Sequence, residues 1–544
     1  MQSLLKMRSR LKPLVRGSAR CMLLLSLAAG AASAQTIPRT ADGKPDLQGI
    51  WQVRNRAAYD LEDHAARHGM PAGRGVVDGG AIPYQPWARE QKRANLASRA
   101  AADPLARCYL PGVPRIMYME FPFHIFQTSS HVAITFEWSQ VHRLIYTHGE
   151  PALYPGVESW MGHSRGRWEG DVLVVEVTDH NDKTWLDAAG NFHSAALRVT
   201  ERFSLRDANT IDYEATIEDP EVFTRPWTIR MPLHRQTGVD RILEYQCQAE
   251  LEEADGDFER DERTWYPAPP PDGNAPFDAE ASARLPAPTV AAEASSELAA
   301  SSAGAEIPRL PDGTPDLGGY YMANAGGANY GLETQTGGVL TPPSRGVVVD
   351  PPDGTLPYQE WARAERIDRA LPHRGYDDPT AHCFVAGIPR SHYVPAPFHI
   401  VQAPGYVVVL FERMSWRQIA LDGRAHLPDS MRLWQGDSVG RWEGDTLVVE
   451  SRNFNGKAWL NEVGDVVTHA QTVVETFTPV SADQVAYRAT VSDPIAYTRP
   501  WTIEIPFDRR ADELLEVACH EDNNDLQHLK DVRDEYRARQ NGEE

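Results

Sequence analysis

The chain has 544 residues with 76 acidic and 54 basic side chains, which leave a formal net charge of -22 at pH 7. This acidic balance argues against nucleic acid and anionic membrane surfaces as binding partners. A neutral or cationic small molecule suits it better.

The first 34 residues have the pattern of a secretory signal peptide. Six basic residues precede an apolar run from Met22 to Ala32, and the run Ala-Ser-Ala at residues 32–34 offers a cleavage site before Gln35. The apolar run is too short to span a bilayer, and no cysteine follows the cleavage site to take a lipid. We therefore expect an exported protein, periplasmic or secreted, that does not insert into the membrane.

Two copies of one domain follow the signal peptide. Residues 162–176 return 274 residues later as residues 436–450 with 12 of 15 positions identical, and such self-similarity indicates a tandem duplication. We assign residues 35–253 to the first repeat and residues 307–528 to the second, and either length is ample for a core of its own. A helical tail is expected at residues 529–544.

The segment between the repeats, residues 254–306, differs from both in composition. It is rich in proline, alanine, serine and acidic residues. Such a segment cannot bury enough apolar surface to fold, so we predict a disordered linker.

Within each repeat, apolar and polar side chains alternate along the chain. Val199, Glu201 and Phe203 share one face of a predicted strand, and the same alternation returns around Glu475. Turn residues separate such strands, as at residues 207–209. The pattern predicts half-buried antiparallel hairpins.

Helices are few in this pattern. We expect one near residues 83–101 and one near residues 357–370. Many short strands with few helices predict a mainly β fold, with two tandem antiparallel β-barrels of the lipocalin-like kind and one or two short helices in each. Closure into a barrel removes exposed sheet edges, and a barrel of about eight to ten strands can hold one small ligand.

The mature chain keeps four cysteines at matched positions of the repeats, namely Cys108, Cys247, Cys383 and Cys519. Four cysteines allow three connectivities, but the repeated spacing in an oxidising compartment favours Cys108 with Cys247 and Cys383 with Cys519. Closing loops of this length stabilises a domain by about 4 to 5 kcal/mol on the chain-entropy model. A metal site built from the cysteines is disfavoured, because no Cys-x-x-Cys motif is present.

Several short motifs recur in both repeats. In the first they are Asp-Gly-Lys-Pro-Asp-Leu at residues 42–47, Cys108 with Gly-Val-Pro-Arg at 112–115, Pro-Phe-His-Ile at 122–125, residues 166–176, Asn181 with Lys183 and Trp185, and Asp-Pro at 219–220 with Thr-Arg-Pro-Trp at 224–227. In this combination the chain resembles a family of secreted bacterial proteins of mostly unknown function. The resemblance covers nearly all of both repeats and implies an exported β-rich domain without defined catalytic residues. Tandem lipocalin-like barrels, as in some carotenoid hydratases and pericyclase-like cyclases, are a looser analogy of fold alone.

Glu201 and its counterpart Glu475 are the sharpest candidates for catalysis. Each lies between a valine and a phenylalanine on the apolar face of its strand. Burial raises the pKa of a carboxyl toward the range in which it acts as a general acid or base near neutral pH. The alternatives are that Glu201 pairs with a buried arginine or that a bulge turns it to solvent.

His124 and His399 recur in the same Pro-Phe-His-Ile setting, so each imidazole points away from the phenylalanine and isoleucine beside it. Either histidine could relay a proton with Glu137 or Glu412 on the next strand. The alternative is a structural histidine that holds a loop carbonyl.

Some histidines occur only in the first repeat. His163 stands where the second repeat has Asp437, and His193 stands where it has Val467. If one repeat alone is active, these differences favour the first, with His163 as a further catalytic candidate, although surface drift explains them equally well. No Glu-x-x-His pattern places metal ligands on one element, so we predict neither a metal nor a cofactor.

Cationic and aromatic side chains of the first repeat are candidates to bind a substrate, namely Arg115, Trp168, Lys183, Trp185, Tyr213 and Trp227. The cations stand beside proline, tryptophan or glycine in both repeats, so stacking on tryptophan is the simpler explanation for them. Ser164 lies in a Gly-x-Ser-x-Gly pattern, but a hairpin follows it and not the helix that a nucleophile elbow requires. We therefore expect no serine hydrolase.

These features predict an exported protein whose barrels hold a small hydrophobic or aromatic molecule in an apolar interior. Our first hypothesis is cofactor-free acid-base chemistry of the lyase, isomerase or cyclase type, carried by Glu201 with His124 and His163. The second is a binding or scavenging protein without turnover. The third is a structural envelope protein whose aromatic residues only fill its core.

Overall fold

The computed structural model describes residues 37–148, 153–247, 306–337, 342–521 and 523–542. The predicted signal peptide, and all of the predicted linker except Glu306, lie outside these described residues. The two repeats belong to one compact unit and contact each other directly.

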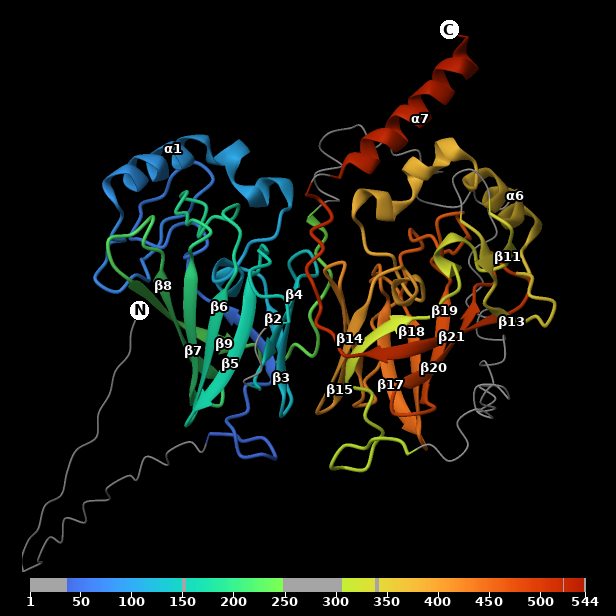
Figure 1. Ribbon diagram of the computed structural model, residues 1–544, viewed down its shortest axis with the longest axis horizontal. Helices are drawn as coiled ribbons and strands as arrows, with labels where there is room; N and C mark the ends of the chain where they lie inside the picture. Colours follow the sequence, from blue (N-terminus) through green and yellow to red (C-terminus); the bar gives the residue numbers. More distant parts are fainter. Residues whose placement is uncertain (1–36, 149–152, 248–305, 338–341, 522, 543–544) are drawn as a thin grey trace, which may run out of the picture. The chain divides into compact units, whose positions relative to one another are not determined.

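The first repeat forms a closed barrel of nine strands that neighbour one another in chain order (Figure 1). The strands are β1 Gly49–Val53, β2 Phe123–Gln127, β3 His131–Phe136, β4 His142–Tyr146, β5 His163–Glu169, β6 Val172–Thr178, β7 Arg198–Asp207, β8 Thr210–Glu218 and β9 Trp227–Arg235. Pairing of β1 with β9 closes the barrel. Neighbouring strands are antiparallel except β4 and β5, which are parallel and share the single pair Tyr146 and Arg165.

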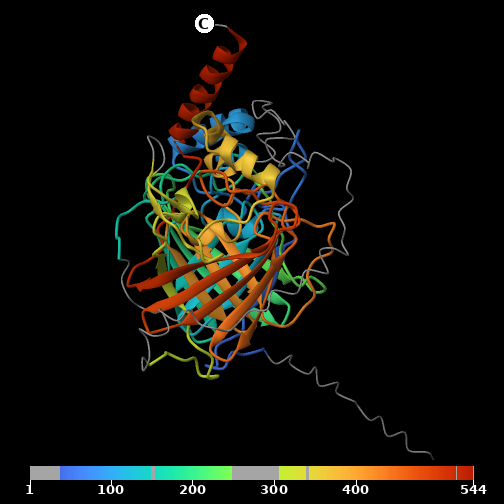
Figure 2. The same ribbon diagram turned by 90° about the vertical axis from the view of Figure 1, so that its right-hand side faces the viewer.

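The second repeat has the same nine strands with one added. The nine are β10 Gly319–Ala323, β14 Phe398–Ala403, β15 Tyr406–Phe411, β16 Ser415–Ala420, β17 Asp437–Glu443, β18 Thr446–Arg452, β19 Thr472–Pro479, β20 Gln484–Ser492 and β21 Trp501–Arg510. Pairing of β10 with β21 closes this barrel, and β13 (Val348–Asp350) lies beside β21 as a tenth strand. Figure 2 shows its tilted strands in orange and red. Two barrels in tandem confirm the predicted fold class.

Short elements surround the barrels. The helix α1 (Pro86–Ala102) begins with a proline in its first turn, which suits the fixed φ of that residue, and α6 (Glu360–Arg369) is its counterpart. Strands β11 (Thr334–Gln335) and β12 (Ser344–Arg345) form a separate ladder. The last helix is α7 (Asn524–Asn541). Of the helices in the described part of the chain, none has the length and apolar character needed to cross a membrane.

The interior of each barrel is filled by large side chains. Strands β7 and β8 bury every second residue, as their period of two predicts. Trp51, Tyr118 and Tyr213 are at most 1% exposed in the first repeat. Burial of such rings against one another supplies most of the stabilisation of each core.

A third apolar cluster joins the two repeats. It is formed by Ile50, Phe126, Ala133 and Ile242 of the first repeat and Val401, Ala403, Val408, Leu410 and Trp416 of the second. Two reciprocal hydrogen bonds flank it. His142 Nε2 bonds to the carbonyl oxygen of Phe411 at 2.8 Å, and Trp416 Nε1 donates to the carbonyl oxygen of Phe136 at 2.9 Å. Because matched strands make matched contacts, an approximate two-fold axis relates the repeats.

The segment that follows each barrel crosses to the other repeat. We name residues 236–247 the first strap and residues 511–521 the second strap. Glu244 of the first strap accepts hydrogen bonds from the backbone N–H groups of Trp434, at 2.6 Å, and Gln435, at 3.0 Å. The first strap is therefore held by the second repeat.

The second strap makes the same contact in the opposite direction. Glu516 accepts hydrogen bonds from the backbone N–H groups of Trp160, at 2.7 Å, and Met161, at 2.9 Å. Burial raises the pKa of Glu516, and of Glu244, to about 7. The repeats thus exchange matching segments, each held through a partly buried carboxyl.

Each strap is fastened to its own repeat by a disulfide. Cys247, at the end of the first strap, bonds to Cys108, and Cys519 of the second strap bonds to Cys383. These are the two pairings that the sequence favoured. A strap is therefore bound at its end to one barrel and along its length to the other.

Candidate functional site

Glu201 faces the interior of the first barrel and is 0% exposed. Arg143 of β4 donates to both of its carboxylate oxygens, from Nη1 to Oε1 at 3.1 Å and from Nη2 to Oε2. The Tyr213 hydroxyl also donates to Oε1, at 2.9 Å. Arg143 Nε donates to the hydroxyl of Ser164 at 2.8 Å. The structure thus has the buried arginine partner that the sequence left open as an alternative.

Glu475 repeats this arrangement in the second barrel. Arg417 Nη1 donates to its Oε1 at 2.9 Å, and the Tyr487 hydroxyl donates to the same oxygen at 2.9 Å. His392 joins the cluster, with Nε2 at 3.1 Å from Arg417 Nη1, where the first repeat has Met117. Burial and the Arg417 charge hold the pKa of His392 well below its usual value. The shared ion pair is a feature of the scaffold.

His124 lies on the outer face of the first barrel. Its ring makes an edge contact with Tyr406 of the second repeat, with centroids 5.0 Å apart, and its Nδ1 is 3.3 Å from Gln418 Oε1. Burial there lowers the pKa of His124 to about 3. The outward orientation agrees with the sequence pattern, but it places His124 and Glu201 on opposite faces of the barrel wall. The structure does not bring these two candidates together.

His399 occupies the equivalent place in the second repeat. Its ring lies 5.3 Å from that of His131 across the contact between the repeats. Burial lowers the pKa of His399 to about 3. Both predicted relay histidines therefore belong to the surface that joins the repeats.

Glu137 and Glu412 hold the straps. Glu137 Oε2 accepts a hydrogen bond from the Leu243 backbone N–H at 2.9 Å, and Glu412 Oε2 accepts one from that of Leu515 at 3.2 Å. Partial burial raises the pKa of Glu137. The described structure shows no hydrogen bond between Glu137 and His124.

Of the three other catalytic candidates, His163 is the one linked to Glu201, through its neighbour Ser164. It precedes Ser164, which contacts Arg143, and it lines a groove beneath the second strap with Arg143 and Glu516. Its Nδ1 lies 3.8 Å from Asp179 Oδ2. His163 is thus connected to Glu201 only through Ser164 and Arg143.

The cationic candidates are engaged in ion pairs. Arg115 is buried and donates from both terminal nitrogens to Asp103, at 2.8 Å each. Arg115 thus has a buried carboxylate partner that the sequence did not predict. Lys183 pairs with Glu521 of the second strap and lies over the Trp160 ring, 5.9 Å from its centroid.

The aromatic candidates are spread over the first repeat. Trp168 on β5 and Trp185 are half-buried, and Trp227 packs on Phe223 with ring centroids 5.3 Å apart. Tyr213 faces inward onto Glu201. The structure does not gather them at one site.

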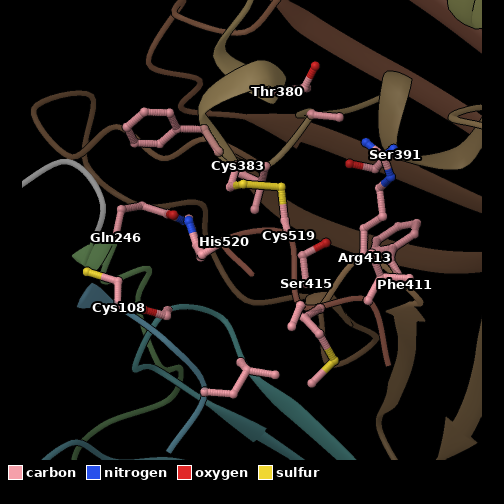
Figure 3. Close-up of a pocket in the computed structure, with 18 of the residues that line it drawn as sticks. Cys108, Gln246, Thr380, Cys383, Ser391, Phe411, Arg413, Ser415, Cys519 and His520 are labelled. Atoms are coloured by element: carbon pink, nitrogen blue, oxygen red, sulfur yellow. A yellow bond between two sulfur atoms is a disulfide. The ribbon is translucent and has the colours of Figure 1, made fainter. Parts of the chain in front are cut away.

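A cleft between the ends of the two straps does bring both repeats together (Figure 3). It contains about 860 Å³ of space between atoms, part of which is open to solvent. The first repeat contributes Cys108, Tyr109, Leu110, Ser139, Trp160 and Gln246. The second contributes Thr380, residues 383–386, Ser391, Val394, Phe411, residues 413–415 and residues 517–520.

Aromatic rings and disulfides form the walls of this cleft. Tyr109 follows Cys108 and lies 5.1 Å from the Trp160 ring, while Phe384 follows Cys383 and stacks on Trp434 at 4.9 Å. Trp160 Nε1 donates to Glu521 Oε2 at 2.8 Å, and its backbone N–H donates to Glu516. Because straps and disulfides hold these rings, the apolar walls are arranged before any ligand arrives.

The cleft carries little charge. Burial lowers the pKa of His520 to about 4, so this imidazole is neutral at neutral pH. Arg413 is exposed to solvent at the edge. Throughout the residues that the structure describes, no three His, Cys, Asp or Glu side chains converge as metal ligands.

Sequence reasoning missed this cleft although one signal was present. An aromatic residue follows the first cysteine of each repeat, as Tyr109 and Phe384 do. The position of Trp160 beside them depends on the second strap, and such a contact between repeats leaves no local pattern in the sequence.

Comparison with known proteins gave no match to any family model, curated protein or solved structure.

Proposed function

We propose that the protein is an exported binding protein for a small, largely apolar or aromatic molecule, and that the molecule lies in the cleft between the repeats. The observation that carries the proposal is the convergence of rings and disulfides from both repeats on a space with little charge. Small-molecule sites are typically concave and apolar with a few polar groups that fix orientation.

The disulfides support the exported location. Disulfides persist in oxidising compartments and are rare elsewhere, and both Cys108–Cys247 and Cys383–Cys519 border the cleft. They would keep the straps, and the cleft walls with them, in place outside the reducing cytoplasm.

Acid-base catalysis by Glu201 is the second candidate function. The observation that favours catalysis is a buried carboxylate in each barrel. However, Arg143 and Tyr213 bind both oxygens of Glu201. Protein donors thus already occupy this carboxylate, and His124 lies on the other face of the wall. Binding without turnover therefore fits the geometry better.

The first experiment tests whether a small aromatic probe binds in the cleft. 2-Naphthol binding to the full mature chain is measured by the fluorescence of the probe, with the variant Ala386→Trp, which adds an indole to a residue that lines the cleft. The control is Trp87→Ala, which removes an exposed indole on α1. We expect Ala386→Trp to weaken binding at least tenfold, and the control to leave it unchanged. Equal affinity in all three proteins would contradict the proposed site.

A second experiment separates binding from catalysis. Protein purified from its native source is denatured, and the molecules released are identified by mass spectrometry. An unchanged apolar compound, absent from the Ala386→Trp variant, supports binding at the cleft. Conversion of that compound by wild type but not by Glu201→Gln would favour the catalytic function instead.

A further inference from the structure

The cleft lies where the approximate two-fold axis places matched turns opposite each other. The backbone N–H of Tyr245 donates to the carbonyl oxygen of Glu137 at 3.2 Å, and that of Val517 donates to the carbonyl oxygen of Glu412 at 3.3 Å. In each repeat a turn after β3 or β15 thus runs beside the end of its own strap. Two such turns face the same cleft.

At matched positions of these turns and strap ends, the residues that line the cleft differ in polarity. Ser139 and Gln246 line it from the first repeat, and Met414 and Ala518 line it from the second. Ser139 and Met414 have the same left-handed backbone, each with φ of 45°. The turn is therefore conserved between the repeats, and the difference lies in the side chains.

Ser139 and Gln246 are neighbours. Each follows a member of the parallel bridge between Trp138 and Tyr245, whose rings stack with centroids 5.2 Å apart. Two adjacent parallel segments place their next residues side by side. The serine and the glutamine therefore line the same part of the cleft.

Both groups are buried without a partner. Ser139 Oγ and Gln246 Nε2 form no hydrogen bond with any group in the described ranges. A buried polar group left unpaired is costly, and a bound ligand is one way to satisfy it. At the equivalent positions of the second repeat, Met414 and Ala518 offer apolar contact, with the polar residues Arg413, Ser415 and His520 beside them in the lining.

We infer that the ligand is an uncharged amphiphilic molecule with one hydroxyl or carbonyl oxygen, which Ser139 and Gln246 bind while its apolar body packs toward Met414 and Ala518. This inference rests on the proposed binding function of the cleft. The duplication supplies two equivalent walls, and these four side chains give the ligand a single orientation. In Figure 3, Gln246 and Arg413 lie on different sides of Cys519, so the exposed guanidinium is apart from the Gln246 end.

The experiment compares two probes of the same shape. 2-Naphthol carries a hydroxyl, and 2-methylnaphthalene carries a methyl group in its place. Ser139→Ala and Gln246→Leu remove the polar groups with little change in shape, and Met414→Leu is the matched control on the apolar side. We expect each of the first two variants to weaken 2-naphthol binding about fivefold, as the loss of one hydrogen bond predicts, and to leave 2-methylnaphthalene binding unchanged. Met414→Leu should not change the ratio of the two affinities.

The possible outcomes distinguish failure of this inference from failure of the proposed binding function on which it rests. If wild type binds both probes equally and Ser139→Ala and Gln246→Leu change nothing, the orientation is wrong and the binding site stands. If neither probe binds wild type, the inference and the binding site both fail. Should either variant misfold, Met414→Ser with Ala518→Gln gives a second test, because a new polar end should tighten 2-naphthol alone. Failure to do so in a folded protein would overturn the inference.

Discussion

Removal of the Glu201 carboxylate should destabilise the first barrel. In Glu201→Gln the Arg143 guanidinium, which is 4% exposed, loses the carboxylate that pairs with it and keeps the Ser164 hydroxyl as a partner. Breaking a buried ion pair from one side costs about 3 to 5 kcal/mol, because the remaining charge is uncompensated in a medium of low dielectric constant. We expect a loss of that size in the free energy of unfolding.

The double variant Arg143→Met with Glu201→Leu should behave differently. It removes both charges, and replacement of a buried ion pair by apolar side chains is often neutral. The Tyr213 and Ser164 hydroxyls lose partners, at about 1 to 3 kcal/mol for an unpaired group. We therefore expect the double variant to be more stable than Glu201→Gln.

The assay is urea unfolding with the disulfides intact, followed by near-ultraviolet circular dichroism. Glu475→Gln, which breaks the equivalent pair with Arg417, is the matched variant in the second barrel. A change in stability of less than 1 kcal/mol in Glu201→Gln would refute the ion-pair reasoning. It would also favour a catalytic role for Glu201, because a catalytic acid can be replaced without loss of the fold.

Three further predictions concern the straps and the contact between the repeats. Serine at both Cys108 and Cys247 opens a loop of 139 residues and should lower the free energy of unfolding by about 4 to 5 kcal/mol; a loss below 1 kcal/mol in urea unfolding would contradict this. Burial raises the pKa of Glu516 from 4.5 to about 7, so its contribution to stability is full below pH 4.5 and is lost as the pH rises through 7. Glu516→Gln should therefore reduce the fall in stability between pH 5 and 8 by on the order of 3 kcal/mol, and an unchanged slope in thermal unfolding would argue against titration there. Burial lowers the pKa of His124 from 6.5 to about 3, so its contribution is full above pH 6.5 and is lost as the pH falls through 3. The intrinsic fluorescence of the 14 tryptophans, Trp416 among them, should report this loss between pH 5 and 3 in wild type and less of it in His124→Gln, whereas identical titrations would contradict the assignment.

Local patterns in the sequence were enough to predict the barrels. The alternation around Glu201 predicted β7 and its inward face, because a strand turns every second side chain to one side. The matched cysteines predicted both disulfides. Arg143, the partner of Glu201, was not predictable, since it lies 58 residues away on β4.

The contact between the repeats was beyond such patterns. The orientation of His124 was predicted correctly, but the face that it points to is covered by Tyr406 of the other repeat. Glu244 and Glu516 lie outside the named strands and helices, and their backbone partners lie in the other repeat. The cleft depends on these long-range contacts, so periodicity alone could not locate it.

The most direct test of the binding site is a crystal structure of the mature protein with 2-naphthol. We expect the naphthyl ring to lie between Trp160 and Phe384, with the oxygen of the probe toward Ser139 and Gln246. Probe density inside either barrel, or no ordered probe at a saturating concentration, would contradict it.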